Sequence, residues 1–537
     1  MPATFRLAEE VARLLARGAL LLRALPAQPR QAAIVSLQLV WFKRDLRIDD
    51  HRPLVEAVKR GPVLPVYVVE PGFWRGRDTS RRQQDFIADS LADLHVALEH
   101  LGQGLLLEHG DMIDVLQRLH QRWRFGAIHA HEETGNDWTF QRDRVVRAWC
   151  QQVDVALHEY PQFGVLRGLR RRDGWARQWE ACMAEPPVSP PNALPGVTAT
   201  RLSRKPFAAA PASGQLDCPG RQRGGLKAGA EVLASFLDQR AEAYRGGISS
   251  PLSAQTAGSR LSPHIAYGTL SLRRLVQRTR DKAAEARASG AKRLAGSLNH
   301  FDKRLHWHCH FIQKLEQQPD IEFANVHRGF DGMREDRFDA ERFQAWAEGR
   351  TGYPLVDACM RFLIQHGWLN FRMRAMLMSF AAYQLWLHWR EPALHLARLF
   401  TDYEPGIHYN QCQMQSGTTG INTLRIYNPV KQAHDQDPEA LFVRRWLPEL
   451  VHVPPDRCFE PWKLGLVERQ RYGAEDYPEP VVDHQRAARQ ARALIGEYRR
   501  QEGFHDEAKA IQESLGSRKS VPRRRRAQTS ARQPSLF

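Results

Sequence analysis

Residues that could do chemistry are concentrated between Phe343 and Pro438. The first half of this stretch carries apolar residues at helical spacing, four of the chain's fourteen tryptophans, and arginines between them. An aromatic-rich helical core would explain that half by itself. It would not explain the predicted loop that follows, in which polar side chains crowd beside the core. These side chains are Asp402, Glu404, His408, Asn410 and Gln411.

Five short motifs occur together in and around this stretch: QAWAEGRTGYPLVDACMR, GWLNFRMR, LWLHWRE, SGTTG and RIYNPVKQ. In this order and at this spacing they closely resemble the flavin-binding region of the photolyase/cryptochrome family. Nearer the N-terminus, VWFKRDLRIDDHRPL resembles the family's opening signature, and weaker similarity extends from Leu39 to Lys463. The resemblance implies FAD as the cofactor, held without a covalent bond.

The resemblance places charged residues beside the flavin ring. The family's flavin-facing arginine falls on Arg374 and its aspartate partner on Asp402, with Glu404 among the cofactor-binding positions. A guanidinium there stabilises negative charge on the reduced ring, and a carboxylate holds the guanidinium in place. His408 falls on the position that faces the flavin N5 atom, where a histidine can exchange a proton near neutral pH. The alternatives are an ordinary interhelical salt bridge for the first pair and a solvent-facing loop histidine for His408.

A second part of the expected cofactor site precedes a predicted helix. The residues that match the family's phosphate-binding segment are Tyr244, Ser259, Arg260, Leu261 and Ser262. Hydroxyl groups and the backbone N–H groups of a helix start can bind a pyrophosphate without a dedicated cation. Most pairs of serines at this spacing are only helix caps, so the assignment depends on the resemblance.

The expected DNA-binding residues include departures from the photolyase pattern. Trp307 and Arg372 are retained, and a tryptophan at that place can stack on an extruded pyrimidine pair. Arg304 stands where photolyases carry a lesion-contacting Glu, and His308–Cys309 replaces an Arg–Glu pair. Met414 replaces the second tryptophan of the lesion clamp.

The resemblance also implies a chain of three tryptophans that carries electrons from the surface to the flavin. Its middle position is retained as Trp389, whereas Cys412 and Asp336 stand at the inner and outer positions. Neither substitute relays single electrons well in this role, so we expect slow photoreduction or another route. The aromatic residues that could form such a route are Tyr383, Trp386 and Trp368.

No metal site is expected from the histidine-rich segment RLHWHCHF. His306 and His310 share a helix face, but no acidic or thiol ligand is placed to complete a site. A polar wall of the substrate pocket is the better interpretation of these side chains.

The predicted fold is an α/β domain, with a doubly wound parallel sheet, joined to an all-α FAD-binding domain. Short apolar runs predict strands at Leu39–Phe42, Val63–Val69 and Ala127–Ala130, with helical stretches between them. The expected boundaries are residues 1–36 for an N-terminal extension, 37–165 for the antenna-type domain and 166–229 for a linker. They continue with 230–480 for the helical domain, 481–515 for a C-terminal helix and 516–537 for a disordered basic tail. A second antenna chromophore of unknown identity is possible, although Trp138 and Thr139 replace the polar pair that holds a folate in some relatives.

The composition indicates which cellular compartment and which kinds of partner to expect. The chain has 77 Lys and Arg against 60 Asp and Glu, a net charge of +17, which favours a polyanionic partner such as damaged single- or double-stranded DNA. Seven cysteines without a CxxC pair indicate a reducing compartment, and we expect a cytoplasmic monomer. No membrane span is expected, because arginines interrupt the apolar run near the N-terminus.

The last residues, Gln533-Pro534-Ser535-Leu536-Phe537, resemble the peptide by which bacterial repair proteins dock on the DNA sliding clamp. The alternative is a tail that only improves solubility. For the whole chain the leading hypothesis is light-driven repair of pyrimidine dimers. The others are a cryptochrome-type blue-light receptor and a DNA-binding flavoprotein without photochemistry.

Overall fold

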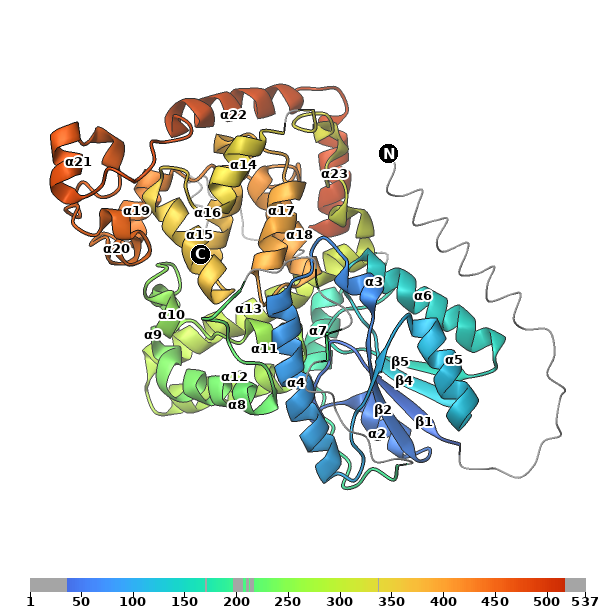
Figure 1. Ribbon diagram of the computed structural model, residues 1–537. Helices are drawn as coiled ribbons and strands as arrows, with labels where there is room; N and C mark the ends of the chain where they lie inside the picture. Colours follow the sequence, from blue (N-terminus) through green and yellow to red (C-terminus); the bar gives the residue numbers. More distant parts are fainter. Residues whose placement is uncertain are drawn as a thin grey trace, which may run out of the picture. The chain divides into compact units, whose positions relative to one another are not determined.

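The computed structural model describes residues 36–169, 171–196, 206–208, 212, 217–336 and 338–516. Five parallel strands form one sheet in the order β3-β2-β1-β4-β5 (Figure 1). They are β1 (Gln38–Phe42), β2 (Val63–Val69), β3 (Leu106–His109), β4 (Ala127–His131) and β5 (Ala156–Tyr160). The chain moves outward from β1 to β3 and returns to the other side of β1 at β4, so the strand order reverses between β1 and β4. In sheets of this kind ligands bind at the carboxyl ends of the strands beside that reversal.

The three predicted strands are confirmed within one residue at each end. Every residue of β1, β2 and β4 is buried, as expected for strands covered on both faces. The edge strands β3 and β5 carry no such apolar run and remain half exposed, which is why the sequence did not reveal them. The accompanying helices are α2 (Arg52–Val58), α3 (Pro71–Trp74), α4 (Arg81–His100), α5 (Met112–Trp123) and α6 (Asp137–Gln152).

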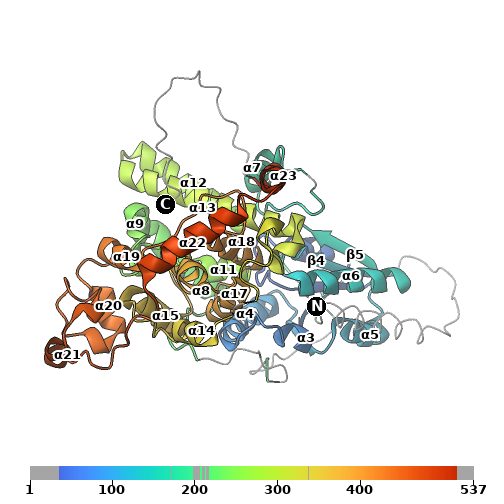
Figure 2. The ribbon, with the colours of Figure 1, turned by 90° about the horizontal axis from the view of Figure 1, so that it is seen from above.

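The rest of the described chain is helical, as predicted (Figure 2). The segment expected to be a linker contains α7 (Trp175–Ala184). The helices that follow it are α8 (Leu226–Ser235), α9 (Ala241–Gly247), α10 (Ala254–Ala257), α11 (Ser262–Ala266), α12 (Leu272–Ala288), α13 (Lys292–Gln317), α14 (Ala340–Ala347), α15 (Pro354–His366), α16 (Phe371–Ser379), α17 (Arg390–Leu399), α18 (Pro405–Ser416), α19 (Pro429–Gln436), α20 (Leu441–Trp446), α21 (Leu466–Tyr472), α22 (His484–Tyr498) and α23 (Phe504–Leu515). The expected single C-terminal helix is therefore two helices, and Gly503, with φ of 78°, precedes the second. None of the described helices has the length and apolar content that crossing a membrane would require.

Two close backbone approaches fix the centre of the helical part. A Cβ atom on Gly406 would lie 2.6 Å from the Ile312 Cα, so glycine lets α18 cross α13 at short range. Gly367, with φ of 64°, ends α15, and its carbonyl accepts a hydrogen bond of 2.8 Å from the Thr401 N–H. A Cβ there would lie 2.3 Å from the Thr401 hydroxyl. These contacts bring the segment before α18 against the loop before α16.

Hydrogen bonds join the α/β part to the helical part. The Arg82 guanidinium, on α4, is almost fully buried and donates to the carbonyls of Leu363 and Leu399. Arg44, which follows β1, donates to the Tyr403 carbonyl at 2.9 Å and to Glu404 Oε2 at 3.0 Å. The residues just before α18 therefore contact both parts.

All seven cysteines are free, as expected for a chain without a disulfide framework. Five of them are buried, and the other two are partly buried.

Candidate functional site

A partly buried ion pair joins α16 to the segment before α18. Arg374 on α16 donates from Nη2 to Asp402 Oδ2 at 2.7 Å and from Nε to the Leu369 carbonyl at 2.6 Å. Its guanidinium also lies 4.0 Å from the Phe400 ring centre. Asp402 is 7% exposed, and its other oxygen, Oδ1, is buried without a hydrogen-bond partner. Three contacts therefore fix the guanidinium, and Asp402 Oδ1 remains available to accept a hydrogen bond from a ligand.

A second guanidinium faces the same region. Arg260 lies on the loop before α11 with φ of 60°, and its side chain stacks 3.8 Å from the Trp368 ring centre. Gln222 donates to the Arg260 carbonyl at 2.9 Å, which holds this backbone conformation. Burial lowers the pKa of Arg260 to about 10, and the nearby Asp402 carboxylate opposes that shift. Within the described residues no ion pair joins Arg260 to a carboxylate.

The serines of this segment contribute less than the sequence indicated. Ser262 opens α11, which has only five residues, and Ser259 Oγ accepts from the Leu261 N–H at 3.5 Å. Arg240 binds the carbonyls of Gly258 and Ser259, so the loop is held by a further cation. We expected a phosphate site without a dedicated cation. The structure instead places a buried guanidinium, Arg260, in the middle of the segment.

Tyr244, which was predicted to bind the cofactor, and Asn370 are also buried in the helical part. Tyr244 is buried on α9 among the rings of Phe236, Phe301 and His300. Asn370, which precedes α16, donates to the carbonyls of Ile248 and Ser249, while its own Oδ1 is buried without a partner. Open acceptors therefore occur at both Asn370 and Asp402.

His408 lies on α18 and not in a loop, and it is 8% exposed. Its Nε2 donates to the Ala393 carbonyl at 2.8 Å and lies 3.6 Å from the Cys412 sulfur. Burial lowers the pKa of His408 to about 4. The ring is therefore neutral at pH 7 with Nδ1 as its acceptor, and the expected proton exchange near neutral pH is not supported.

Glu404 immediately precedes α18 and is paired across the two parts of the molecule. Its Oε2 accepts from Arg44, while Oε1 is buried without a partner. Burial raises the pKa of Glu404 to about 7, and the Arg44 charge acts in the opposite direction. The structure gives this residue a partner in the α/β part that the sequence could not indicate.

The residues expected to face DNA lie on three helices. Trp307 is half buried on α13 beside the rings of His310 and Phe311, while Arg372 lies on α16 and Met414 on α18. Asn410 of α18 donates to the Phe311 carbonyl at 3.1 Å, so α13 and α18 are in direct contact.

The histidines of α13 contact several aromatic rings. His306 contacts the rings of Trp175 and Trp179, and His310 contacts Trp175 and Trp307. Both histidines therefore contact α7, and the polar wall of the substrate pocket stays a prediction.

The expected electron relay is interrupted. Trp389 is fully buried, and its indole N–H donates to the Asn325 side chain at 2.9 Å. Burial raises the pKa of the Cys412 thiol, so it remains protonated, and Asp336 is exposed. The aromatic ring adjacent to Trp389 on α18 is Tyr409, with centres 6.4 Å apart.

A cavity that is partly open to solvent lies at the carboxyl ends of β1, β2 and β4. Its walls carry several aromatic rings, among them Trp41, Tyr67, Trp74, Tyr267 and Tyr403. Thr139 also lines it, whereas Trp138 packs against Phe73.

The charges around this cavity are paired. Arg142 binds Glu70, Glu133 and Asp143, and Lys43 binds Asp143 at 3.0 Å. Burial raises the pKa of Glu70 to about 7. No cation of this group is left for a phosphate, so the cavity suits a planar heterocycle without one.

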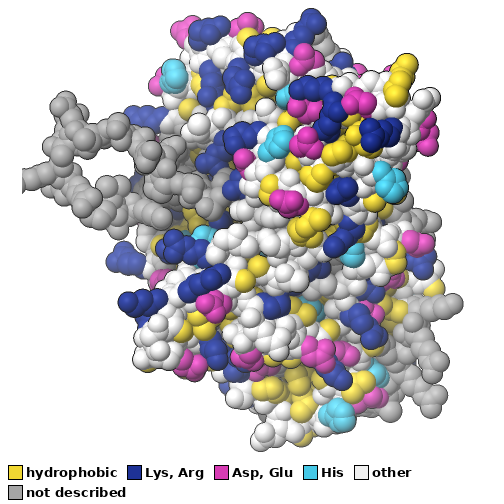
Figure 3. All heavy atoms as spheres, turned by 90° about the vertical axis from the view of Figure 1, so that its left-hand side faces the viewer, with side chains coloured by type: hydrophobic (Ala, Val, Ile, Leu, Met, Phe, Trp, Pro, Cys, Tyr) yellow, Lys and Arg dark blue, Asp and Glu magenta, His cyan; other side chains and the backbone are white. Residues whose placement is uncertain are grey.

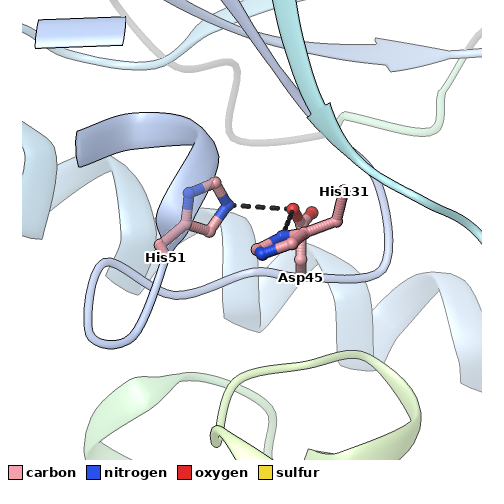
Figure 4. A group of neighbouring side chains, drawn as sticks. All are labelled: Asp45, His51 and His131. Atoms are coloured by element: carbon pink, nitrogen blue, oxygen red, sulfur yellow. Dashed lines mark hydrogen bonds and ion pairs between the residues drawn. The ribbon is translucent and has the colours of Figure 1, made fainter. Parts of the chain in front are cut away.

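A separate cluster in the α/β part has the residue types of a metal site. Asp45, His51 and His131 offer ligand atoms within 4.8 Å of one another, and both imidazole rings point at the same carboxylate (Figure 4). Asp45 Oδ2 accepts from His51 Nε2 at 2.9 Å and from His131 Nδ1 at 2.7 Å, while Oδ1 accepts from the Lys43 N–H.

The tautomer of His51 argues against a metal ion at this cluster. Its Nδ1 accepts from the Leu54 N–H at 3.1 Å, so Nε2 must carry the ring hydrogen and has no lone pair for a metal. The cluster is a structural hydrogen-bond centre. The sequence showed its three residues but not their proximity, because His131 lies far along the chain.

Comparison with known proteins agrees with this geometry. Two family models match the sequence: DNA photolyase over residues 38–165, and the FAD binding domain of DNA photolyase over residues 301–497. A deoxyribodipyrimidine photo-lyase of Streptomyces griseus is 32% identical over 474 residues, which cover 84% of this chain and 97% of the relative. A cryptochrome DASH of Gloeobacter violaceus is 30% identical over 480 residues, which cover 83% and 93%. A bacterial class III photolyase from Agrobacterium tumefaciens shares the structure with a TM-score of 0.76 at 25% identity, covering 88% of this chain and 100% of that one. The chain therefore belongs to the photolyase/cryptochrome family and contains that family's FAD-binding domain.

Proposed function

We propose that this protein is a light-driven DNA repair enzyme, a deoxyribodipyrimidine photolyase-like lyase that splits pyrimidine dimers with reduced FAD. The observation that carries the proposal is the Arg374–Asp402 pair, in which hydrogen bonds fix the guanidinium and one buried carboxylate oxygen has no hydrogen-bond partner. Relatives named deoxyribodipyrimidine photo-lyase, one of them 32% identical, support the same assignment.

The residues present fit FAD. Arg260, with the hydroxyls of Ser259 and Ser262, would hold the diphosphate, and Arg374 with Asp402 would hold the ring. Two buried acceptors without partners, Asn370 Oδ1 and Asp402 Oδ1, are suited to N–H donors of a ligand. Reduced FAD would supply a light-driven electron that the dimer takes up and returns on splitting.

The protein's own groups prepare that chemistry. Arg374 supplies a fixed positive charge, because Asp402 and the Leu369 carbonyl hold its guanidinium. His408 presents a neutral ring at pH 7, so it adds no second charge there. Trp307 would stack on a dimer extruded from the helix.

DNA is the proposed partner. The net charge of +17 favours a polyanion, and Figure 3 shows Lys and Arg side chains spread over one face with fewer acidic groups between them. The basic tail and the proposed sliding-clamp peptide, Gln533–Phe537, lie outside the described residues. The clamp interaction stays a prediction, to be checked by titrating a labelled peptide of the last fifteen residues with purified clamp.

The test is illumination of the reduced protein with oligonucleotides that contain a cyclobutane dimer, in single- and double-stranded form. We expect repaired dimers to accumulate with repeated turnover, and Trp307→Ala to lower repair more than flavin content. The matched control is Trp123→Ala, a half-buried tryptophan of the α/β part. No turnover on either substrate would contradict the repair assignment.

A cryptochrome-type blue-light receptor is the second candidate. Arg304 and Met414, which replace a lesion-contacting Glu and a clamp tryptophan, favour it, and so does the similarity to a cryptochrome DASH. Photoreduction without repair in the same experiment would select this function. DNA binding without photoreduction would select a flavoprotein that has lost photochemistry.

We also propose the cavity at the carboxyl ends of β1, β2 and β4 as the site of a second chromophore. Its aromatic walls and fully paired cations favour a planar heterocycle that carries no phosphate. Ile87→Phe would introduce a larger side chain at the wall. We expect it to abolish binding of such a chromophore while FAD content stays unchanged; loss of both would contradict the assignment.

A further inference from the structure

A tyrosine next to the flavin-facing residues donates its hydroxyl hydrogen to a carboxylate from the other part of the molecule. The Tyr403 hydroxyl donates to Asp78 Oδ2 at 2.7 Å. Tyr403 precedes α18 and is 7% exposed; Asp78 lies between α3 and α4 and is 5% exposed. Asn136 also donates to Asp78 Oδ2, at 3.1 Å, which fixes the carboxylate.

Tyr403 is one end of a continuous group of aromatic rings. The ring centres of Tyr403 and Tyr409 are 6.3 Å apart. Tyr409 in turn lies 6.4 Å from Trp389. Rings at such separations are near edge-to-face contact, over which electrons pass readily.

The same tyrosine borders both proposed chromophore sites. Its ring centre is 5.3 Å from that of His408, and its side chain lines the cavity at the carboxyl ends of β1, β2 and β4. The residue that follows Asp402 in the chain is therefore also one of those that line the cavity in the α/β part.

Only Tyr403 among the three rings has a base as hydrogen-bond partner. The Trp389 N–H donates to a neutral amide oxygen of Asn325. Burial and the Asp78 charge raise the pKa of the Tyr403 phenol, so the phenol is protonated before oxidation.

We propose that Tyr403 and Asp78 form a redox-active pair that traps an oxidising equivalent by coupled loss of an electron and a proton. This inference rests on the FAD of the proposed function: before FAD is reduced for repair, its oxidised, photoexcited form would be the oxidant. An electron leaves Tyr403 for the oxidant, either directly or after Trp389 and Tyr409 have been oxidised in turn. The Tyr403 O–H bond breaks, the proton forms a new O–H bond on Asp78 Oδ2, and a neutral tyrosyl radical remains. Return of an electron and the proton restores the phenol.

The pair supplies what the interrupted tryptophan chain lacks. With Cys412 protonated and Asp336 exposed, neither of these side chains can hold the oxidising equivalent. A phenol whose proton already points at a carboxylate is the side chain of this region best suited to hold it.

The chain contains a matched control pair. Tyr477 donates its hydroxyl hydrogen to Asp357 Oδ2 at 2.6 Å, and both residues are almost fully buried. No aromatic ring contact joins Tyr477 to another ring within the described residues. The two pairs therefore share their hydrogen bond and differ in their access to an oxidant.

The test is electron paramagnetic resonance of the full-length protein, frozen after oxidation by two independent routes. One arm excites the bound flavin with blue light. The other uses photogenerated tris(bipyridine)ruthenium(III), which needs no flavin. We expect a neutral tyrosyl signal in both arms that falls about tenfold in Tyr403→Phe and Asp78→Asn, since a positioned base is removed. Tyr477→Phe should leave the signal unchanged, and circular dichroism establishes that each variant is folded.

Three outcomes decide the matter. A signal that survives in Tyr403→Phe, or that Tyr477→Phe removes, overturns the proposal. Absence of a Tyr403-dependent signal in both arms also overturns it. A signal in the ruthenium arm alone supports the redox-active pair and counts against the flavin chemistry under Proposed function.

Discussion

Two buried clusters of this protein contain residue types that can do chemistry, and they differ in their hydrogen bonding. In the α/β part, Asp45 accepts hydrogen bonds from His51, His131 and the Lys43 N–H, and His51 accepts one from the Leu54 N–H. In the helical part, Asp402 binds Arg374 through one oxygen and leaves the other buried without a partner. Residue type alone would favour the first cluster as a site, for a metal. The unpaired oxygen of Asp402 favours the second cluster as a ligand site. Buried polar groups usually have a hydrogen-bond partner, and a bound ligand would supply the missing one.

The largest expected effect is a loss of stability at the cluster of Asp45, His51 and His131, which we call the closed cluster. Asp45→Ala would leave the Lys43 N–H and two buried histidines without their acceptor, so we expect the free energy of unfolding to fall by about 3–5 kcal/mol. Urea denaturation measures it. The control is Asp49→Ala, a partly exposed ion pair to Arg274, which should cost about 1 kcal/mol or less. Equal losses in the free energy of unfolding for the two variants would contradict the structural role assigned to the closed cluster.

The next largest effect is expected on cofactor binding at the Arg374–Asp402 pair, which we call the open cluster. Arg374→Ala removes a charged hydrogen-bond donor near the ring, so FAD affinity should fall about 10- to 100-fold. The flavin reduction potential should also fall, because the reduced ring loses a stabilising positive charge. Titration of flavin-free protein and a redox titration measure the two quantities. Arg361→Ala, which breaks the Arg361–Glu449 pair on α15, is the control; wild-type values for Arg374→Ala would contradict the assignment.

Acid should act on the closed cluster. Burial lowers the pKa of His131 to about 3, and His51 shifts in the same direction. The unfolded chain, with a histidine pKa near 6.5, then binds more protons than the folded one. The free energy of unfolding should therefore fall as the pH drops from about 6.5 toward 3, by up to about 1.4 kcal/mol per pH unit for each such histidine.

His131→Gln should reduce this slope in urea denaturation between pH 7 and 4. If the slope is unchanged, His131 is not neutral in the fold. Zinc added at pH 7 should leave the melting temperature of the wild type unchanged, since a bound ion would raise it. A zinc-dependent rise that His131→Gln removes would show the cluster to be a metal site after all.

The smallest effect is expected at the stacked guanidinium. Arg260→Lys keeps a positive charge but loses the planar contact with Trp368, so FAD affinity should fall by about 3- to 10-fold. The same flavin titration measures it. A larger loss than for Arg374→Ala would reverse the order of importance proposed for the two arginines.

The sequence predicted the elements that carry a simple hydrophobic pattern. The buried runs of β1, β2 and β4 were recognisable because both faces of these strands are covered. The segment after Asp402 was expected to be a loop but is α18. Its polar residues are buried and bond to backbone groups, as Gln413 does with the Ile321 carbonyl at 2.9 Å, so no apolar stripe marks the helix.

The ion pair of the candidate site followed from the family resemblance, whereas its surroundings did not. Glu404 bonds Arg44 and Tyr403 bonds Asp78, partners more than three hundred residues away in the chain. The low pKa of His408 likewise comes from burial, which one residue in a sequence does not reveal. Contacts of this kind depend on how the two parts of the chain pack.

The central claim is that the open acceptor of Asp402 marks the cofactor site and the closed Asp45 cluster does not. The most direct measurement is a fluorescence titration of FAD into flavin-free protein for Asp402→Asn and His131→Gln, with the wild type alongside. We expect one FAD per chain in the wild type and in His131→Gln with the same affinity, and about tenfold or weaker binding in Asp402→Asn. Unchanged binding in Asp402→Asn, or a loss in folded His131→Gln as large as in Asp402→Asn, would contradict the account.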